Sequence, residues 1–226
     1  MSRARLSPAS AVNASDRAHA LAITPVSRET AARLERFIGL LLSWQRATHL
    51  IAPSTVPNLW TRHIADSLQL LDLVPQARVW VDFGSGGGFP GMVIACALAE
   101  APGAIVHLVE SNTKKAAFLR EAQRLTQAPV HVHAARMGDL AQRFQGQGDV
   151  LTARAVAPLN SLLDQCFLLL GKNGATGLFP KGQNAELELA QARRAWTMDA
   201  ALMPSRTHPS GRIIVVRDVE RSKLVS

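Results

Sequence analysis

The fold is decided by the stretch Val81-Asp82-Phe83-Gly84-Ser85-Gly86-Gly87-Gly88-Phe89-Pro90-Gly91. It reads as the end of a buried strand, an acidic residue, a glycine-rich turn and a helix that begins near Pro90. Five of the chain's 15 glycines lie within these eleven residues. Because glycine has no Cβ, the backbone can turn sharply there and lie against a ligand. The stretch therefore predicts the binding site of a small cofactor.

Strands and helices alternate from residue 78 to the end of the chain. Repeated β-α units of this kind predict an α/β fold with a doubly wound, mainly parallel sheet. Ligands in such sheets bind beyond the carboxyl ends of the strands. We expect strands at 78–83, 105–109, 130–133, 150–153 and 175–180, helices at 91–99, 114–126, 138–144, 159–170 and 186–194, and a closing antiparallel pair at 196–203 and 212–217.

The first part of the chain predicts a helical cap over residues 27–76, ahead of a main domain over 77–226. A helix should begin near Ser27, a typical N-cap residue, and a second should run over 58–73. Residues 1–26 are rich in Ala and Ser and read as a flexible tail. Their composition resembles that of a transit peptide, and whether they direct localisation stays open.

Charge and composition limit the function classes. Lys and Arg exceed Asp and Glu by 25 − 17 = +8, which favours an anionic partner, above all nucleic acid. Nothing in the sequence is long and apolar enough to predict a membrane span. Cys96 and Cys166 lie in apolar helical patterns and read as buried thiols in a reducing compartment. We therefore expect a cytoplasmic protein, without a metal site and working as a monomer.

Three kinds of cofactor are candidates for the glycine turn. A nucleotide-hydrolysing Walker A loop requires Gly-Lys-Ser/Thr, which the stretch lacks. The dinucleotide fingerprint is matched by residues 86–91, but this register begins two residues after the expected end of the strand. S-adenosylmethionine needs a close backbone approach and a carboxylate for its ribose hydroxyls. Asp82 ends the first strand and Glu110 ends the second, where a carboxylate accepts two hydroxyl hydrogens strongly.

The acidic residue does not by itself separate the candidates, because Glu110 also suits a nicotinamide dinucleotide or a simple helix cap. The basic charge favours a methyltransferase of RNA. A nicotinamide-dependent oxidoreductase and a cofactor-free RNA-binding protein remain alternatives, and acidic residues at both strand ends argue against a lost cofactor site. Calorimetry with each cofactor separates the three.

Further motifs stand in a fixed order around the glycine turn. Together with Phe89-Pro90-Gly91, they make the chain resemble the RsmG (GidB) family from about Ser27 almost to the C-terminus. The resemblance implies a bacterial enzyme that uses S-adenosylmethionine to methylate guanine N7 in 16S ribosomal RNA, with a Rossmann-like class I methyltransferase fold. The motifs are Arg62-His63-Ile64-Ala65-Asp66-Ser67-Leu68, Glu110-Ser111-Asn112-Thr113-Lys114-Lys115, Phe118-Leu119-Arg120, Arg154-Ala155 and Lys181-Gly182-Gln183.

The resemblance also assigns residues. Met137 and Gly138 would hold the adenine with backbone groups, and Arg154 would face the methionine end of the cofactor or the target base. The family often has Asp at position 110 and Glu at position 138, and the glycine at 138 leaves only backbone for a contact. The cofactor-binding candidates are Asp82, Gly84, Gly86, Phe89, Glu110, Met137, Gly138 and Arg154.

The chemistry of this transfer needs no general base, since guanine N7 carries a lone pair and no proton. Catalysis is then mainly positioning, and we predict no conventional catalytic acid or base. Arg154 is the candidate for positioning the base or its phosphate, with a structural ion pair as the alternative. The expected partner is 16S ribosomal RNA or a precursor of the small ribosomal subunit, contacted by Lys181, Arg136 and Arg212.

Overall fold

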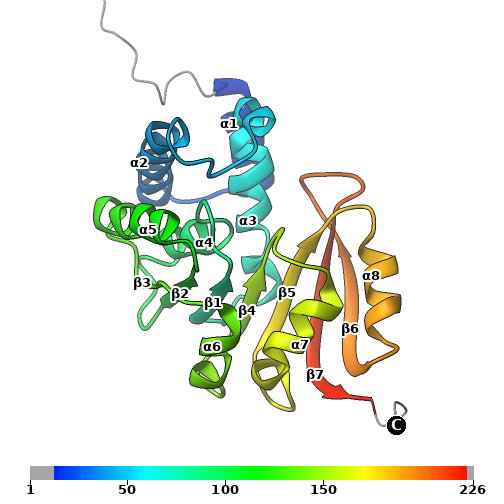
Figure 1. Cartoon of the computed structure of the whole chain (residues 1–226). Helices are drawn as coiled ribbons and strands as arrows, with labels where there is room; N and C mark the ends of the chain where they lie inside the picture. The colour runs from blue at the N-terminus through cyan, green and yellow to red at the C-terminus, as the bar shows by residue number, and fades with distance from the viewer. Residues whose placement is uncertain (1–12, 223–226) are drawn as a thin grey trace, which may run out of the picture.

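The structure, a computed structural model, describes residues 13–222 and contains one seven-stranded sheet (Figure 1). The strand order is β3-β2-β1-β4-β5-β7-β6. The first five strands run parallel, β7 is antiparallel to β5, and β6 is antiparallel to β7. The strands are β1 (Val79–Phe83), β2 (Ile105–Val109), β3 (Val130–His133), β4 (Val150–Ala153), β5 (Thr176–Lys181), β6 (Trp196–Pro204) and β7 (Arg212–Arg221).

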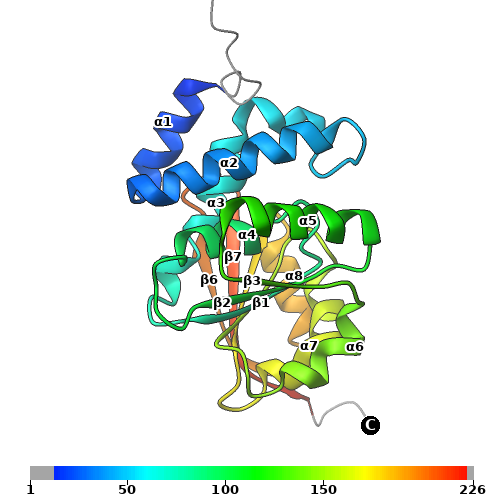
Figure 2. The same cartoon turned by 90° about the vertical axis from the view of Figure 1, so that its left-hand side faces the viewer.

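Helices cover both faces of the sheet, and each face has its own apolar cluster. Side chains alternate along β1, so Trp80 lies in one cluster while Val81 and Phe83 lie in the other. Figure 2 shows α2, α4 and α5 on one side of the sheet and α6 and α7 on the other. The buried residues of α8 lie in the same apolar cluster as those of α7. These helices are α2 (Arg28–Gln45), α4 (Gly91–Ala97), α5 (Thr113–Thr126), α6 (Met137–Ala141), followed by the 3-10 turn η5 (Gln142–Phe144), α7 (Leu159–Leu170) and α8 (Ala185–Ala192).

The predicted architecture is confirmed. The strands at 105–109, 130–133 and 150–153 and the helix at 159–170 have the predicted ends. The last strand runs four residues further than expected, to Arg221, because its far end pairs with Trp196 and Thr197 of β6. In the part of the chain that the structure describes, no helix is both long and apolar enough to cross a membrane.

The prediction of a flexible tail is wrong for residues 14–23, which form the helix α1 (Ala14–Ile23). The side chain of Asn13 caps this helix by accepting the N–H of Ser15. Asp16 is buried, and its Oδ2 accepts the N–H of Trp60 at 2.8 Å. Burial of Asp16 and Ala20 therefore fixes the helix against the cap. The rest of the predicted tail before residue 13 lies outside the described residues.

The second predicted cap helix is a series of short turns of different types. Pro57 lacks an N–H and lies inside the first of them, which is a 3-10 helix. The next turn is π-helical, and the Asp16 carboxylate accepts N–H groups at its start. The turns are η2 (Pro53–Asn58), η3 (Trp60–Ala65), α3 (Asp66–Leu68) and η4 (Leu71–Leu73).

Candidate functional site

The glycine turn lies at the carboxyl end of β1, as predicted, and is bound to the end of β2. The N–H groups of Gly84 and Ser85 donate to the carbonyl of Val109 at 2.8 and 3.1 Å. Gly86 has φ +53°, and a Cβ there would meet only the Gly84 carbonyl oxygen, at 3.6 Å. The backbone at Gly86 thus presents a bare face on which a flat ligand can lie.

Glu110 ties this turn to the next helix. Its Oε2 accepts the N–H of Gly86 at 2.8 Å, and its Oε1 accepts the N–H of Asn112 at 2.7 Å. Asn112, not Glu110, caps α5 by accepting the N–H groups of Lys114 and Lys115. Each oxygen of a carboxylate accepts two hydrogen bonds, so Glu110 retains acceptor capacity for a ligand.

Asp82 supports the turn from beneath. It is 1% exposed, its Oδ1 accepts from the Thr152 hydroxyl at 2.7 Å, and its Oδ2 accepts the N–H of Gly91 at 3.2 Å. Burial raises the pKa of Asp82 to about 6, and these hydrogen bonds act in the opposite direction. Asp82 therefore orders the start of α4.

Arg154, which follows β4, is held by one helical turn of the cap. Its guanidinium donates to the Arg62 carbonyl at 3.2 Å, to Asp66 Oδ2 at 3.1 Å and to His63 Nδ1 at 2.6 Å. The Arg154 Cζ also lies 5.3 Å from the ring centroid of Phe89, which is buried. The ion pair with Asp66 is the structural alternative anticipated for Arg154, and it fixes the direction of the guanidinium.

His63 is a neutral acceptor in this cluster. Its Nδ1 accepts from Arg154, so its Nε2 carries the proton and donates to Thr55 Oγ1 at 2.8 Å. Burial, and then the positive charges of Arg154 and Arg62, lower the pKa of His63 from 6.5 to about 3. Arg154 is thereby connected to the cap through an uncharged ring.

This pKa predicts a pH dependence of stability. A histidine whose pKa falls on folding stabilises fully above pH 6.5, and the contribution declines as the pH falls toward 3. Asparagine keeps an acceptor near the Nδ1 position and does not titrate. Below pH 6.5, the stability advantage of the unchanged protein over His63→Asn should shrink by about 1.4 kcal/mol per pH unit. Denaturant unfolding at pH 7, 6 and 5 measures this; parallel curves for the two proteins would contradict it.

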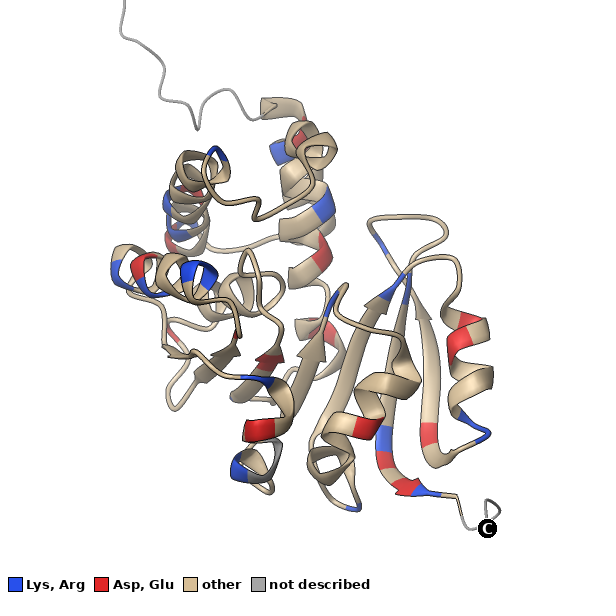
Figure 3. Ribbon diagram, viewed as in Figure 1, with Lys and Arg blue, Asp and Glu red and all other residues tan. Residues whose placement is uncertain are grey.

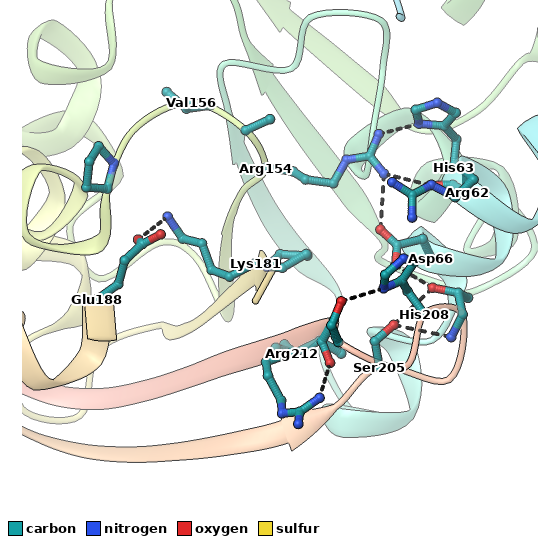
Figure 4. Close-up of a pocket in the computed structure, with 18 of the residues that line it drawn as sticks. Arg62, His63, Asp66, Arg154, Val156, Lys181, Glu188, Ser205, His208 and Arg212 are labelled. Atoms are coloured by element: carbon teal, nitrogen blue, oxygen red, sulfur yellow. Dashed lines mark hydrogen bonds and ion pairs between the residues drawn. The ribbon is translucent and has the colours of Figure 1, made fainter. Parts of the chain in front are cut away.

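A cavity of about 610 Å³ opens beside Arg154 (Figure 4). Its walls come from the cap, the loop after β4, the end of β5, the helix α8 and the loop between β6 and β7. Four cationic side chains and two carboxylates line it, so its charge is positive. These are Arg62, Arg154, Lys181, Arg212, Asp66 and Glu188.

The predicted RNA-contacting residues fall in different places. Lys181 lies in the cavity wall, where its Nζ donates to the Ala157 carbonyl at 2.7 Å and pairs with Glu188 Oε2 at 2.8 Å. Arg212 also lines the cavity and donates to the carbonyls of Pro209 and Gly211. Arg136 is exposed, just before α6, and is not part of this lining. Figure 3 shows how the charged residues are distributed over the elements.

The remaining cofactor candidates lie outside the cavity lining. Met137 is buried among apolar side chains, and Gly138 is exposed at the start of α6. Met137 and Gly138 can therefore contact a ligand through backbone groups and not through a side chain. The residues that α8 and the β6–β7 loop bring to the cavity were not predicted, because no motif marks them in the sequence: Glu188, Ser205, Thr207 and His208.

Known proteins are similar to this chain in sequence and in fold. The GidB family model, described as rRNA small subunit methyltransferase G, matches residues 30–211. A Bradyrhizobium protein named ribosomal RNA small subunit methyltransferase G is 57% identical, covering 94% of this chain and 96% of its own. A protein of the same name from Rhodopseudomonas palustris is 54% identical and covers 96% and 93%.

Solved structures give the fold. An O-methyltransferase from Bacillus cereus, in complex with SAH, has a TM-score of 0.60 at 16% identity and covers 92% of this chain and 99% of its own. A putative O-methyltransferase from Klebsiella pneumoniae has a TM-score of 0.57 at 15% identity and covers 92% and 97%. The fold is thus that of the class I S-adenosylmethionine-dependent methyltransferases. From its matched residues and its relatives, the chain belongs to the rRNA small subunit methyltransferase G (GidB) family of S-adenosylmethionine-dependent enzymes.

Proposed function

We propose that this enzyme transfers a methyl group from S-adenosylmethionine to N7 of a guanine in 16S ribosomal RNA. The observation that carries the proposal is the position of the positively charged cavity beside the glycine turn. Val156 lines the cavity, and a Cβ built on Gly84 would lie 2.5 Å from its Cγ2. The acceptor cavity and the turn that holds the donor are therefore adjacent.

We assign the donor to the groups around the turn. Gly84 and Gly86 offer a bare backbone surface, Glu110 retains acceptor capacity for ribose hydroxyls, and Met137 and Gly138 offer backbone groups. Phe89 and Asp82 are buried, so they act by shaping the turn and by supporting Arg154 and Gly91. S-adenosylmethionine, when bound, supplies a methyl group that its sulfonium already activates.

The transfer needs no base from the protein. The N7 lone pair forms the new N–C bond as the S–C bond breaks, the bonding electrons remain on sulfur, and the positive charge passes to the guanine. No proton leaves. The protein's task is to position the two reactants, which contributes about 7–11 kcal/mol when the geometry is near that of attack. Arg154, fixed by His63 and Asp66, is the residue placed to orient the acceptor nucleotide.

We propose that the enzyme acts as a monomer in the cytoplasm. In support, the cavity draws residues from both the cap (27–76) and the main domain (77–226) of one chain. Leu34 of the cap and Trp80 of the sheet also lie in one apolar cluster, so the cap and the sheet share a core.

We assign the RNA contacts to Lys181, Arg212 and Arg136, since the chain carries a net charge of +8. RNA affinity should therefore fall steeply as salt increases, and removing one phosphate-binding side chain should flatten the logarithmic slope by about one unit. We expect Arg212→Ala to show the smaller slope in filter binding, and Arg217→Ala, on the far part of β7, to match the unchanged protein. Equal slopes for the unchanged protein and both variants would show that Arg212 does not contact RNA phosphate.

The direct test combines binding with transfer. Calorimetry should detect binding of S-adenosylmethionine and no binding of a nicotinamide dinucleotide. In a transfer assay, label from methyl-labelled S-adenosylmethionine should enter 16S ribosomal RNA or small subunits. Borohydride reduction followed by aniline cleaves RNA at N7-methylguanosine, so cleavage at the labelled position identifies the atom. Label without cleavage would place the methyl group on another atom, and no label would contradict the function.

A further inference from the structure

We infer that Glu188 recognises the Watson–Crick edge of the acceptor guanine inside the cavity, an inference that rests on the proposed function. Two carboxylates line the cavity, Asp66 and Glu188. Asp66 is committed to protein groups: Oδ1 accepts from Gln69 Nε2 and the Thr207 hydroxyl, and Oδ2 accepts from Arg154. Glu188 is different, because only one of its oxygens is used.

The used oxygen holds Glu188 in one orientation. Oε2 accepts the Leu159 N–H at 2.8 Å and pairs with Lys181 Nζ at 2.8 Å. Lys181 is itself held by the Ala157 carbonyl. Among the described residues, Oε1 accepts no hydrogen bond, although the side chain is only 22% exposed. An anchored carboxylate with one free oxygen is thus part of the cavity wall.

The position of this oxygen suits a purine that presents N7 to the glycine turn. Figure 4 shows Glu188 and Lys181 across the cavity from His63 and Asp66. The turn follows β1, whereas Lys181 ends β5, two strands away in the sheet order, or about 10 Å. On guanine, the 2-amino group at the far end of the Watson–Crick edge points away from N7. A guanine with N7 toward the turn can therefore direct its 2-amino group toward β5 and α8.

A carboxylate at that edge selects guanine. An ionised carboxylate only accepts hydrogen bonds. Guanine presents two adjacent donors there, N1–H and the 2-amino group, whereas adenine and cytosine present a ring-nitrogen acceptor that a carboxylate repels. This edge is accessible only when the base is single-stranded or extruded from a helix, and extruded bases are recognised by this edge. The negative charge also stabilises the guanine as it becomes cationic during methylation.

The test is a competition between guanosine and inosine, which lacks only the 2-amino group. A 16S transcript in which inosine replaces a small, random fraction of guanosine is methylated, and 7-methylguanosine and 7-methylinosine at the modified position are compared by mass spectrometry. The ratio, corrected for composition, is the ratio of kcat/KM values. The unchanged enzyme should favour guanosine by about tenfold or more, the usual effect of one hydrogen bond to a charged group.

Glu188→Gln should bring this preference close to one, since an amide replaces the charged acceptor. Glu186→Gln, an exposed glutamate on the same helix, should keep the full preference. A purely structural role for Glu188 would lower both rates together and leave the ratio intact, which would overturn the inference. Equal methylation of inosine and guanosine by the unchanged enzyme would also overturn the inference. This measurement does not depend on whether a variant folds. Absence of 7-methylguanosine altogether would instead refute the proposed function.

Discussion

Replacing Arg154 with alanine is expected to reduce kcat/KM for methylation of 16S ribosomal RNA by about a hundredfold or more. The guanidinium has three acceptors on one turn of the cap and lies over Phe89, so its direction is fixed before RNA binds. A reaction that depends on positioning alone loses most of its rate when the nucleotide that receives the methyl group can move. The loss should appear in the transfer rate and not in affinity for S-adenosylmethionine.

The fold should survive this substitution. Arg154→Ala leaves His63 Nδ1, the Arg62 carbonyl and Asp66 Oδ2 without their donor. Removing one partner of a buried ion pair costs about 3–5 kcal/mol, against a typical stability of about 5–15 kcal/mol. Thermal unfolding and calorimetry of cofactor binding test this point. Arg221→Ala, which removes an exposed pair with Asp164, is the matched control and should retain full activity. Full activity of Arg154→Ala would refute the positioning role.

Gly91→Ala is expected to lower the free energy of unfolding by about 3 kcal/mol and to abolish measurable cofactor binding. A Cβ at Gly91 would lie 2.7 Å from Asp82 Oδ2 and 2.8 Å from Asp82 Cβ, and it would collide with Leu108. These neighbours are buried strand residues that cannot move aside. The start of α4 must then shift away from β1, and the glycine turn must shift with it.

The matched control is Gly182→Ala, where a Cβ would meet no atom within 4 Å. Its unfolding free energy should stay within about 0.5 kcal/mol of the unchanged protein, as for ordinary surface substitutions. Denaturant unfolding of both variants provides the comparison. A Gly91→Ala protein as stable as Gly182→Ala, with intact cofactor binding, would show that the close packing of α4 on β1 is not required.

The sheet could be predicted from the sequence because its signals are local. Apolar runs such as 105–109 and 150–153, bounded by polar or turn residues, define strands regardless of what lies around them. The helix α1 was missed because its stability comes from a distant contact, the buried Asp16 carboxylate with the N–H of Trp60. Ala- and Ser-rich sequence alone does not reveal such a contact.

The candidate site was predictable at the strand ends and not elsewhere. Arg154 follows β4 and Lys181 ends β5, and the carboxyl ends of these parallel strands share one edge of the sheet, so their proximity to the cavity follows from topology. Glu188 lies on a helix surface and Thr207 in a hairpin loop, where spacing carries no signal. Lys181 was predicted to contact RNA. Its Nζ also binds the Ala157 carbonyl and Glu188, so an RNA contact must share that ammonium group.

The most direct test of methyl transfer to guanine N7 is mass mapping of nuclease fragments of 16S ribosomal RNA from cells with and without this protein. We expect one guanosine that carries an added methyl group only when the protein is present. That position should be cleaved after borohydride and aniline treatment, and its methylation should be lost with Arg154→Ala and kept with Arg221→Ala. Identical modification patterns in the two RNAs, or a protein-dependent methyl group on another base, would show that the enzyme does not carry out this reaction.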